Sequence, residues 1–202
     1  MKHILVTGAS GFIGGAVTEA LAERGDRVTA VDQQVGPLLA TLAETYAEVR
    51  PQACEITEWA ALSELVRREP PDAVVHCAAV VGVPASVQAP FRTMEVNVGG
   101  ALTLFEVARL HGVKRILHMS TEETYGAFRS PCIDESHPQN PVLAYGISKL
   151  AVEQLGRSYG ALYGLDVVNL RICWVYGPGL PRPRVPKTLV DAAVDGRPLH
   201  LP

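Results

Sequence analysis

The fold of this chain is decided by the stretch Val6-Thr7-Gly8-Ala9-Ser10-Gly11-Phe12-Ile13-Gly14. The apolar run Ile4-Leu5-Val6 leads into it and is typical of a buried parallel strand, and the residues after it have the apolar spacing of a helix. Gly8 suits a sharp turn, Gly11 lets the backbone approach a diphosphate, and Gly14 lets the helix pack closely on the strand. The pattern predicts a strand, a glycine turn and a helix whose first N–H groups face a diphosphate.

An acidic residue, Asp32, ends the next apolar run, which spans residues 27–32. It follows the glycines by about 20 residues, where a carboxylate can accept hydrogen bonds from the adenosine ribose and would repel a 2′-phosphate. Gln33 and Gln34 follow where NADP would favour a basic residue. The pattern favours NAD as the cofactor. The alternative is that Asp32 only ends its strand.

Composition restricts the classes of protein. The chain has 202 residues, is 48% hydrophobic and carries a net charge of −3, which is typical of a globular domain with a sizeable core. Its interspersed charges give no electrostatic reason to expect nucleic acid or a membrane as partner. No apolar run reaches the ~20 residues of a membrane span. Because Met1-Lys2-His3 leads directly into the first strand, we expect no signal peptide.

Cysteine usage indicates the compartment. The four cysteines are scattered along the chain: Cys54, Cys77, Cys132 and Cys173. They form no CxxC pair, so we expect a reduced cytoplasmic protein without a metal site.

Strands and helices are expected to alternate along the rest of the chain. After residue 32, strands are expected over 48–54, 72–79 and 114–120, and helices over 37–46, 57–69, 90–111, 141–155 and 185–194. Residues 121–126 are expected to extend the strand at 114–120. Successive strand–helix units predict an α/β fold: a Rossmann-type, doubly wound parallel sheet with helices on both faces. Its ligand crevice lies beyond the carboxyl ends of the strands.

Two residues on the helix expected from Pro141 carry candidate chemistry. Tyr145 and Lys149 lie one turn apart on one face. A tyrosine with a pKa near 10 needs a shift of roughly 3 units to act as a base near neutral pH, and an ammonium group at about 4 Å supplies most of it. Tyr145 can then shuttle a proton while Thr121 holds a substrate hydroxyl. The alternative is an ordinary solvated helix face.

Seven motifs occur in an order that is informative as a set. They are Thr7 to Gly14, Asp32, His76-Cys77-Ala78-Ala79, Asn97-Val98-Gly99-Gly100, Ser120 to Gly126, Tyr145-Gly146-Ile147-Ser148-Lys149, and Leu170-Arg171 leading to Val175-Tyr176-Gly177-Pro178-Gly179. Together they resemble the extended short-chain dehydrogenases/reductases of the NAD-dependent epimerase/dehydratase family, which includes the nucleotide-sugar 4-epimerases. The resemblance covers essentially the whole chain.

The resemblance implies roles for the residues of the catalytic centre. Tyr145 is implied to be the acid/base, and Lys149 to hold the nicotinamide ribose and to lower the pKa of the tyrosine. Thr121 takes the Ser/Thr position of the family. Asn97 takes the position whose buried polar contacts support the lysine.

The residues themselves and the resemblance together predict a set of NAD contacts. The resemblance implies that Phe12 and Ile13 present backbone N–H groups to the diphosphate. The glycines Gly8, Gly11 and Gly14 form the turn around the diphosphate, and Asp32 contacts the ribose. Glu55 is placed to accept a hydrogen bond from the adenine amino group, although the dipole of the following helix explains it equally well. The two alanines Ala78 and Ala79 leave room for a ligand beside the strand. The set is completed by Ile56, Cys77, Tyr145 and Lys149.

Three features concern the substrate. Glu123, two residues after Thr121, resembles the Thr-x-Glu arrangement of sugar-nucleotide 4,6-dehydratases and decarboxylases, where it would remove a proton from carbon 5 of a 4-keto sugar. The alternative is a glutamate that faces water. Trp174 stands where relatives place an asparagine near the nucleotide phosphates, and Ser86 belongs to a stretch similar to a loop near the sugar. These residues and Glu122 form the expected substrate set.

The end of the chain departs from the family pattern. Residues 1–175 are expected to form the NAD-binding domain with the catalytic Thr121, Tyr145 and Lys149, and residues 176–202 the start of a substrate-binding portion that is largely absent. Family members continue through a seventh strand and a small domain. Either this is the ordered part of a longer protein or it is a fragment, and we favour the first.

Three functions follow, in order of preference. The first is NAD-dependent epimerisation or, slightly less favoured, 4,6-dehydration of a nucleotide sugar through a transient 4-keto intermediate. The second is a net dehydrogenase or reductase of a free sugar, sugar acid or other alcohol, and the third is a non-catalytic NAD-binding regulator. A homodimer is expected through a four-helix interface of residues 102–110 and 150–159. The apolar residues of these two stretches are explained equally well by packing on the sheet.

Overall fold

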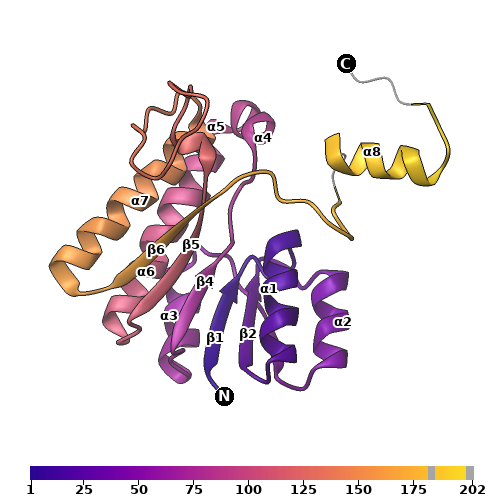
Figure 1. Cartoon of the computed structure of the whole chain (residues 1–202). Helices are drawn as coiled ribbons and strands as arrows, with labels where there is room; N and C mark the ends of the chain where they lie inside the picture. The colour runs from indigo at the N-terminus through magenta and orange to yellow at the C-terminus, as the bar shows by residue number, and fades with distance from the viewer. Residues whose placement is uncertain (182–184, 199–202) are drawn as a thin grey trace. The chain divides into compact units, whose positions relative to one another are not determined.

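The computed structural model describes residues 1–181 and 185–198. Six parallel strands form one sheet in the order β3-β2-β1-β4-β5-β6 (Figure 1). The strands are β1 (His3–Thr7), β2 (Arg27–Asp32), β3 (Val49–Ala53), β4 (Ala73–His76), β5 (Arg115–Thr121) and β6 (Asp166–Ile172). The order reverses between β1 and β4, which is where a doubly wound sheet binds its ligand.

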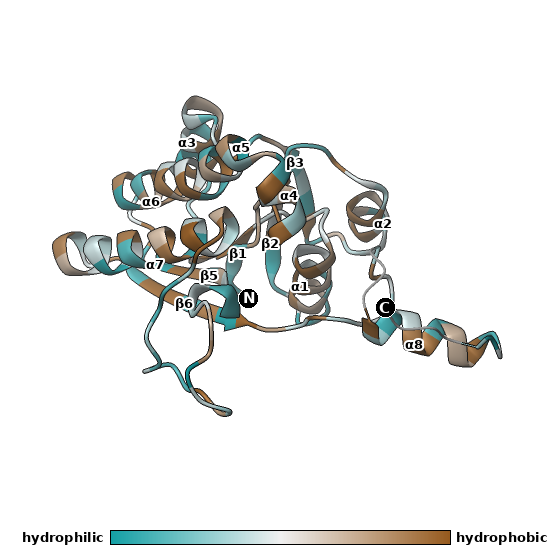
Figure 2. Cartoon of the chain, turned by 90° about the horizontal axis from the view of Figure 1, so that it is seen from above, coloured by the Kyte–Doolittle hydropathy of each residue, from teal (hydrophilic) through white to brown (hydrophobic). Residues whose placement is uncertain are grey.

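Helices cover both faces of this sheet and confirm the predicted fold class. In Figures 1 and 2, α1 and α2 lie on one face, and α3, α6 and α7 lie on the other. Their bounds are α1 (Phe12–Glu23), α2 (Pro37–Thr45), α3 (Trp59–Arg68), α6 (Gly100–Leu110) and α7 (Ala144–Tyr163). Neighbouring residues of one strand face opposite ways, so Leu5 packs in the core under α3, α6 and α7, and Val6 in the core under α1 and α2.

The register of the strands brings their carboxyl ends together. Thr7 pairs with His76, and His76 pairs with His118, three residues before the end of β5 at Thr121. All five residues of β1 are buried, as in a central parallel strand. In β6, at the end of the sheet order, exposed and half-buried residues alternate up to Arg171.

The helix expected from Pro90 to residue 111 is divided by a wider turn. The short helix α5 (Pro90–Met94) is followed by the π-helical turn η1 (Glu95–Gly99) and then by α6. Asn97 lies in this turn and is buried. A π turn inside a helix is frequent at functional sites, because the wider turn re-aims one side chain.

Four further elements differ from the sequence expectation. β4 ends at His76, three residues before the expected end of that strand. β5 ends at Thr121, and the 3₁₀ turn η2 (Glu122–Thr124) replaces the expected strand extension, because the Thr121 hydroxyl accepts a hydrogen bond from the Glu123 N–H. The stretch expected as a loop near the sugar contains the short helix α4 (Val83–Gln88). Helix α7 begins three residues later than expected and continues to Tyr163, where Gly164 ends it with a left-handed backbone.

The chain divides into two compact units, Met1–Ile172 and Cys173–Pro202. The first contains the sheet and the helices that cover it. The second contains α8 (Val185–Val194), which confirms the expected helix there. Among the residues that the structure describes, no helix is long and apolar enough to span a membrane.

Candidate active site

The glycine turn between β1 and α1 brings two chain segments into close approach. Gly8 has a φ of +68°, in the region that favours glycine, and a Cβ added there would lie 2.6 Å from the Ala78 nitrogen. A Cβ at Gly14 would collide with the Gly8 carbonyl oxygen. The Gly11 N–H donates to the same oxygen, 3.0 Å away. The turn therefore places the start of α1, with the N–H groups of its first residues, directly beyond β1.

Asp32 is the last residue of β2 and lies beside this turn. Its Oδ2 accepts a hydrogen bond of 2.9 Å from the Ser10 N–H. The Ser10 hydroxyl donates to the Gln34 carbonyl and accepts from the Gly36 N–H, which ties the segment after β2 to the glycine turn. The carboxylate that was predicted to contact the ribose is thus fixed beside the predicted diphosphate site.

The end of β4 is joined to β1 by Thr7. The Thr7 hydroxyl is 2.7 Å from Nδ1 of His76 and accepts a 3.2 Å hydrogen bond from the Ala78 N–H. The Cys77 N–H donates to the Thr7 carbonyl. Burial raises the pKa of the Cys77 thiol to about 12, so this cysteine stays protonated and contributes backbone and bulk rather than thiolate chemistry.

Glu55 and Ile56 are two expected NAD contacts whose side chains contact other residues of the chain. The Glu55 carboxylate pairs with Arg92 on α5, which also pairs with Glu95. Ile56 is buried in the core, where its side chain fills the space that a Cβ on Gly100 would need. An adenine amino group would therefore share Glu55 with Arg92, which the sequence pattern did not indicate.

Lys149 is a buried cation on α7. It is 2% exposed, and its Nζ donates a 2.7 Å hydrogen bond to the Met119 carbonyl oxygen on β5. Burial lowers the pKa of Lys149 to about 8, which leaves the ammonium form predominant at neutral pH. Tyr145, one turn earlier, is half-buried, and Thr121 is 4% exposed at the end of β5.

Asn97 supports this helix through a neighbour of the lysine rather than through the lysine itself. Its Nδ2 donates to the Ser148 hydroxyl at 2.9 Å and to the Val80 carbonyl at 3.1 Å, and its Oδ1 accepts from the Val80 N–H at 2.7 Å. The Ser148 hydroxyl donates in turn to the Tyr145 carbonyl. Asn97 thus joins the segment after β4 to the first turns of α7, and the support that it gives Lys149 is indirect.

The acid in contact with Thr121 is Glu122. The Thr121 hydroxyl donates to Oε2 of Glu122 at 3.0 Å, whereas Glu123 contributes its N–H to the same hydroxyl. Both glutamate side chains are half-buried. A Cβ on Gly146 would lie 2.6 Å from the Glu123 carbonyl oxygen, so η2 packs directly on the first turn of α7. This contact places the elements of Thr121 and Tyr145 side by side.

The other two expected substrate residues are Ser86 and Trp174. Ser86 is fully buried within α4, and its hydroxyl donates to the Val83 carbonyl of the same helix. Trp174 belongs to the second unit, has a φ of +41° and is 55% exposed.

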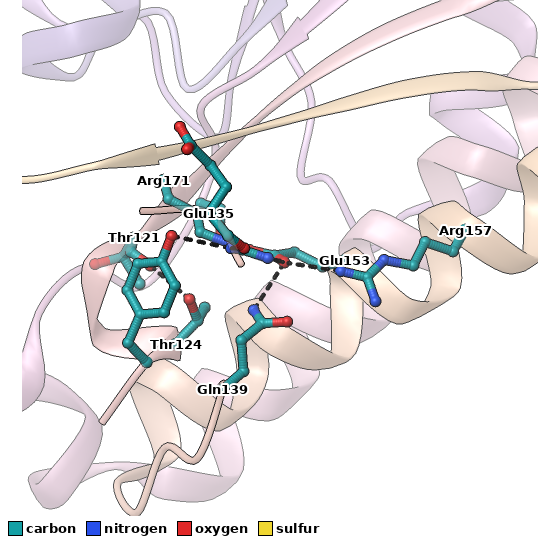
Figure 3. A network of polar contacts seen from close by, with 9 residues as sticks. Thr121, Thr124, Glu135, Gln139, Glu153, Arg157 and Arg171 are labelled. Atoms are coloured by element: carbon teal, nitrogen blue, oxygen red, sulfur yellow. Dashed lines mark hydrogen bonds and ion pairs between the residues drawn. The ribbon is translucent and has the colours of Figure 1, made fainter. Parts of the chain in front are cut away.

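A buried charge network adjoins the site and was missed from the sequence. Glu153, one turn after Lys149 on α7, is fully buried and bonds to Ser120, Gln139 and Arg171 (Figure 3). The available signal was a glutamate at the helical spacing of four residues from Lys149, which by itself is common on exposed helix faces.

A second group that the sequence did not indicate is the pair His76 and His118. Their rings stack with centroids 5.4 Å apart. Burial lowers the pKa of His76 to about 3 and that of His118 well below its ordinary value, with Lys149 contributing in both cases. Both imidazoles are therefore neutral spacers beneath the site. Over residues 1–181 and 185–198, no group of three His, Cys, Asp or Glu side chains is placed to hold a metal ion.

Comparison with family models decides the relationship of the chain. Residues 4–200 match the model of the NAD dependent epimerase/dehydratase family. The chain belongs to this family. Among curated relatives, a UDP-glucuronate 4-epimerase of Thermodesulfobacterium geofontis is 32% identical over 185 residues, covering 88% of this chain and 57% of that protein. A UDP-glucose 4-epimerase of Lacticaseibacillus casei is 34% identical over 178 residues, covering 86% and 52%.

Solved structures of family members superpose well on this epimerase/dehydratase chain. A UDP-glucose 4-epimerase of Thermotoga maritima, solved with UDP-glucose, gives a TM-score of 0.88 at 29% identity over 98% of this chain and 65% of that chain. A dTDP-glucose 4,6-dehydratase of Streptomyces venezuelae, solved with NAD, gives 0.83 at 35% identity over 96% and 62%. The chain spans about half the length of the curated relatives it matches.

The residues of this family member fit the cofactor of the family. A diphosphate requires backbone without side chains at the start of α1, and the close approach of Gly8 to Ala78 leaves no space for a Cβ at the turn. A ribose requires an acceptor, and Asp32 is held beside the turn. These two observations concern the chain's own atoms and agree with NAD at this edge of the sheet.

Proposed function

We propose that this chain is the NAD-binding and catalytic portion of an enzyme that epimerises a nucleotide sugar through a transient 4-keto intermediate. The observation that carries the proposal is the buried Lys149, one turn from Tyr145 on a helix that packs against the end of β5 next to Thr121. The similarity to UDP-sugar 4-epimerases supports the choice of substrate class. The activity is that of the whole protein, because the relatives are longer than this chain.

In this proposal the cofactor is held by the glycine turn, Asp32 and Lys149. When bound there, NAD would supply a reversible hydride acceptor for the sugar carbon. Tyr145 takes the proton of the sugar hydroxyl, which it can do near neutral pH because the ammonium group of Lys149 favours the phenolate. Thr121 orients that hydroxyl, and its own proton is held by Glu122.

Protonation of Lys149 is central to this mechanism. Because burial lowers the pKa of Lys149 to about 8, the stabilising cation is lost as the pH rises above that value in the absence of other ligands. Tyr145 would return the proton when the hydride adds to the opposite face of the ketone. The cofactor then leaves the cycle unchanged, which separates an epimerase from a net dehydrogenase.

A second candidate function, 4,6-dehydration, is favoured by the two glutamates. Glu122 bonds to the hydroxyl of Thr121, and Glu123 is half-buried in the turn that packs on α7. A carboxylate near carbon 5 of a 4-keto sugar can abstract the proton that begins loss of water. The likeness to a dTDP-glucose 4,6-dehydratase at 35% identity supports this candidate.

The proposed enzyme is a homodimer through α6 and α7. Large apolar side chains on these helices remain exposed in the single chain: Leu102 by 41%, Leu110 by 50%, Ile147 by 41% and Leu162 by 67%. Pairing of the two helices with those of a second copy would cover such residues. Light scattering of the full-length protein tests this, and a monomeric mass would refute it.

The deciding experiment incubates the full-length protein with NAD and a panel of nucleotide sugars. Products are analysed by mass spectrometry while NADH absorbance is followed. An unchanged mass with an altered sugar and no net NADH supports epimerisation, and loss of one water supports dehydration. NADH that accumulates only with a free sugar or sugar acid refutes both and supports a dehydrogenase.

A further inference from the structure

The carboxylate of Glu153 is the centre of a buried network that joins four parts of the chain. It accepts hydrogen bonds from the Ser120 hydroxyl at 2.6 Å, from Nε2 of Gln139 at 2.9 Å, and from Nη2 and Nε of Arg171 at 2.7 Å and 3.0 Å. Ser120 is on β5, Arg171 is on β6, and Gln139 lies in the segment between η2 and α7. Figure 3 shows the side chains of Gln139 and Arg171 directed at Glu153.

The network is charged as well as buried. Glu153 is 0% exposed, and the side chain of Arg171 is 12% exposed. Burial alone would raise the pKa of Glu153, but hydrogen bonds from Arg171, Ser120 and Gln139 hold it below its ordinary value, so the carboxylate is ionised at neutral pH. Such a pair imposes one geometry, because loss of either partner leaves an unpaired charge inside the protein.

Helix α7 is tied to β5 at two consecutive residues. Lys149 bonds to the carbonyl oxygen of Met119, and Glu153, one turn later, bonds to the hydroxyl of Ser120. The next residue of β5 is Thr121. Under the proposed function Lys149 also serves the nicotinamide ribose, so its tie to β5 is shared with the cofactor. The tie made by Glu153 does not involve the cofactor.

Arg171 extends the network to the segment that precedes α7. Its Nη1 donates to the Tyr125 hydroxyl at 3.0 Å and to the Glu135 carbonyl at 3.1 Å. The guanidinium carbon also lies 4.9 Å from the centroid of the Tyr125 ring. The turn after Thr121 is therefore held from β6 as well as from α7.

We propose that Glu153 is a positioning residue: through Ser120 and Arg171 it fixes the catalytic end of β5 against α7 and so sets the place of the Thr121 hydroxyl relative to Tyr145. The role in turnover rests on the proposed function, whereas the ordering of β5 does not. Displacements of about 1 Å at a reacting group cost up to roughly a hundredfold in rate.

The test uses Ser120→Ala, because this variant breaks the tie to β5 and leaves Glu153 paired with Arg171 and Gln139. The matched control is Arg157→Ala. Arg157 is 58% exposed and 4.0 Å from the Glu153 carboxylate, so its removal deletes a nearby charge without touching β5. A second variant, Glu153→Gln with Arg171→Gln, removes both charges together and keeps the test usable if a single charge deletion fails to fold.

Two measurements are made on the full-length protein. The first is amide hydrogen exchange over residues 119–126, which does not depend on any activity. The second is kcat and KM per NAD-binding site with the substrate found in the panel experiment. Ser120→Ala and the double variant are expected to exchange faster over 119–126 and to lower kcat by about tenfold to a hundredfold, with KM nearly unchanged. Arg157→Ala is expected to match the wild type.

Unchanged exchange in Ser120→Ala overturns the proposal whether or not the wild type is active. Faster exchange with kcat unchanged also overturns it, because β5 would then be ordered by Glu153 without consequence for turnover. A wild type without epimerase or dehydratase activity refutes the proposed function, and the exchange arm then decides alone on the ordering of β5.

Discussion

Replacement of Gly8 by alanine tests the close approach on which the cofactor site depends. Gly8 has a φ of +68°, and an added Cβ would lie 2.6 Å from the Ala78 nitrogen and 2.7 Å from the Cys77 carbonyl carbon. Both contacts are with backbone atoms, so the clash cannot be relieved by rotation of a side chain. Gly25 is the matched control, because its φ is +80° and nothing lies within 4 Å of its Cβ position.

The magnitude follows from two separate costs. A left-handed backbone costs an alanine about 1–2 kcal/mol, which applies to both variants. Overpacking against the end of β4 costs a further 1–3 kcal/mol or so, which applies to Gly8→Ala alone. Gly8→Ala is therefore expected to lose about 2–5 kcal/mol of unfolding free energy, a large share of the roughly 5–15 kcal/mol of a typical domain.

The assay is urea unfolding of both variants, followed by circular dichroism, with NAD affinity measured on the folded fraction. Gly8→Ala is expected to be less stable than Gly25→Ala by at least about 1 kcal/mol and to bind NAD more weakly. Equal losses of stability in the two variants would refute the argument, because they would show that the backbone conformation alone matters and that β4 does not approach the turn.

Three further predictions concern the catalytic helix. Because burial lowers the pKa of Lys149 to about 8, the unfolded chain binds more protons than the folded one between that value and about pH 10.4, so stability rises with pH there. Lys149→Met should remove this rise, which is measured as the urea midpoint of unfolding at several pH values across that range. A variant whose midpoint rises with pH as in the wild type would contradict the argument that Lys149 is buried. Asn97→Ala removes the acceptor of the Val80 N–H and one of the two hydrogen bonds of the Ser148 hydroxyl, and it should cost about 1–3 kcal/mol in urea unfolding; wild-type stability would show that water replaces the amide. Tyr145→Phe should abolish turnover of the full-length enzyme while calorimetry still detects NAD binding, and retained activity would rule out the proposed proton transfer.

Local signals in the sequence determined the fold class and the principal candidate residues. The glycine turn at Gly8, the acid at Asp32 and the spacing of Tyr145 and Lys149 each depend on neighbours within one turn or strand, and periodicity reports such neighbours directly. Apolar runs of the length of buried parallel strands then predicted where strands alternate with helices along the chain. The order of the motifs along the chain indicated the family, which the comparisons confirm.

Tertiary structure decided which side chains meet. Asn97 bonds to Ser148 across 51 positions of the chain, and Arg92 reaches Glu55 across 37. Glu153 accepts hydrogen bonds from two strands and a loop. In the sequence it is indistinguishable from any other charged residue of a helix. Such contacts depend on strand order and on how each helix packs, and hydrophobic periodicity carries no information on either. The alternation of strands and helices was therefore predictable from the sequence, whereas the turns η1 and η2 and the partners of the buried charges were decided only in the folded molecule.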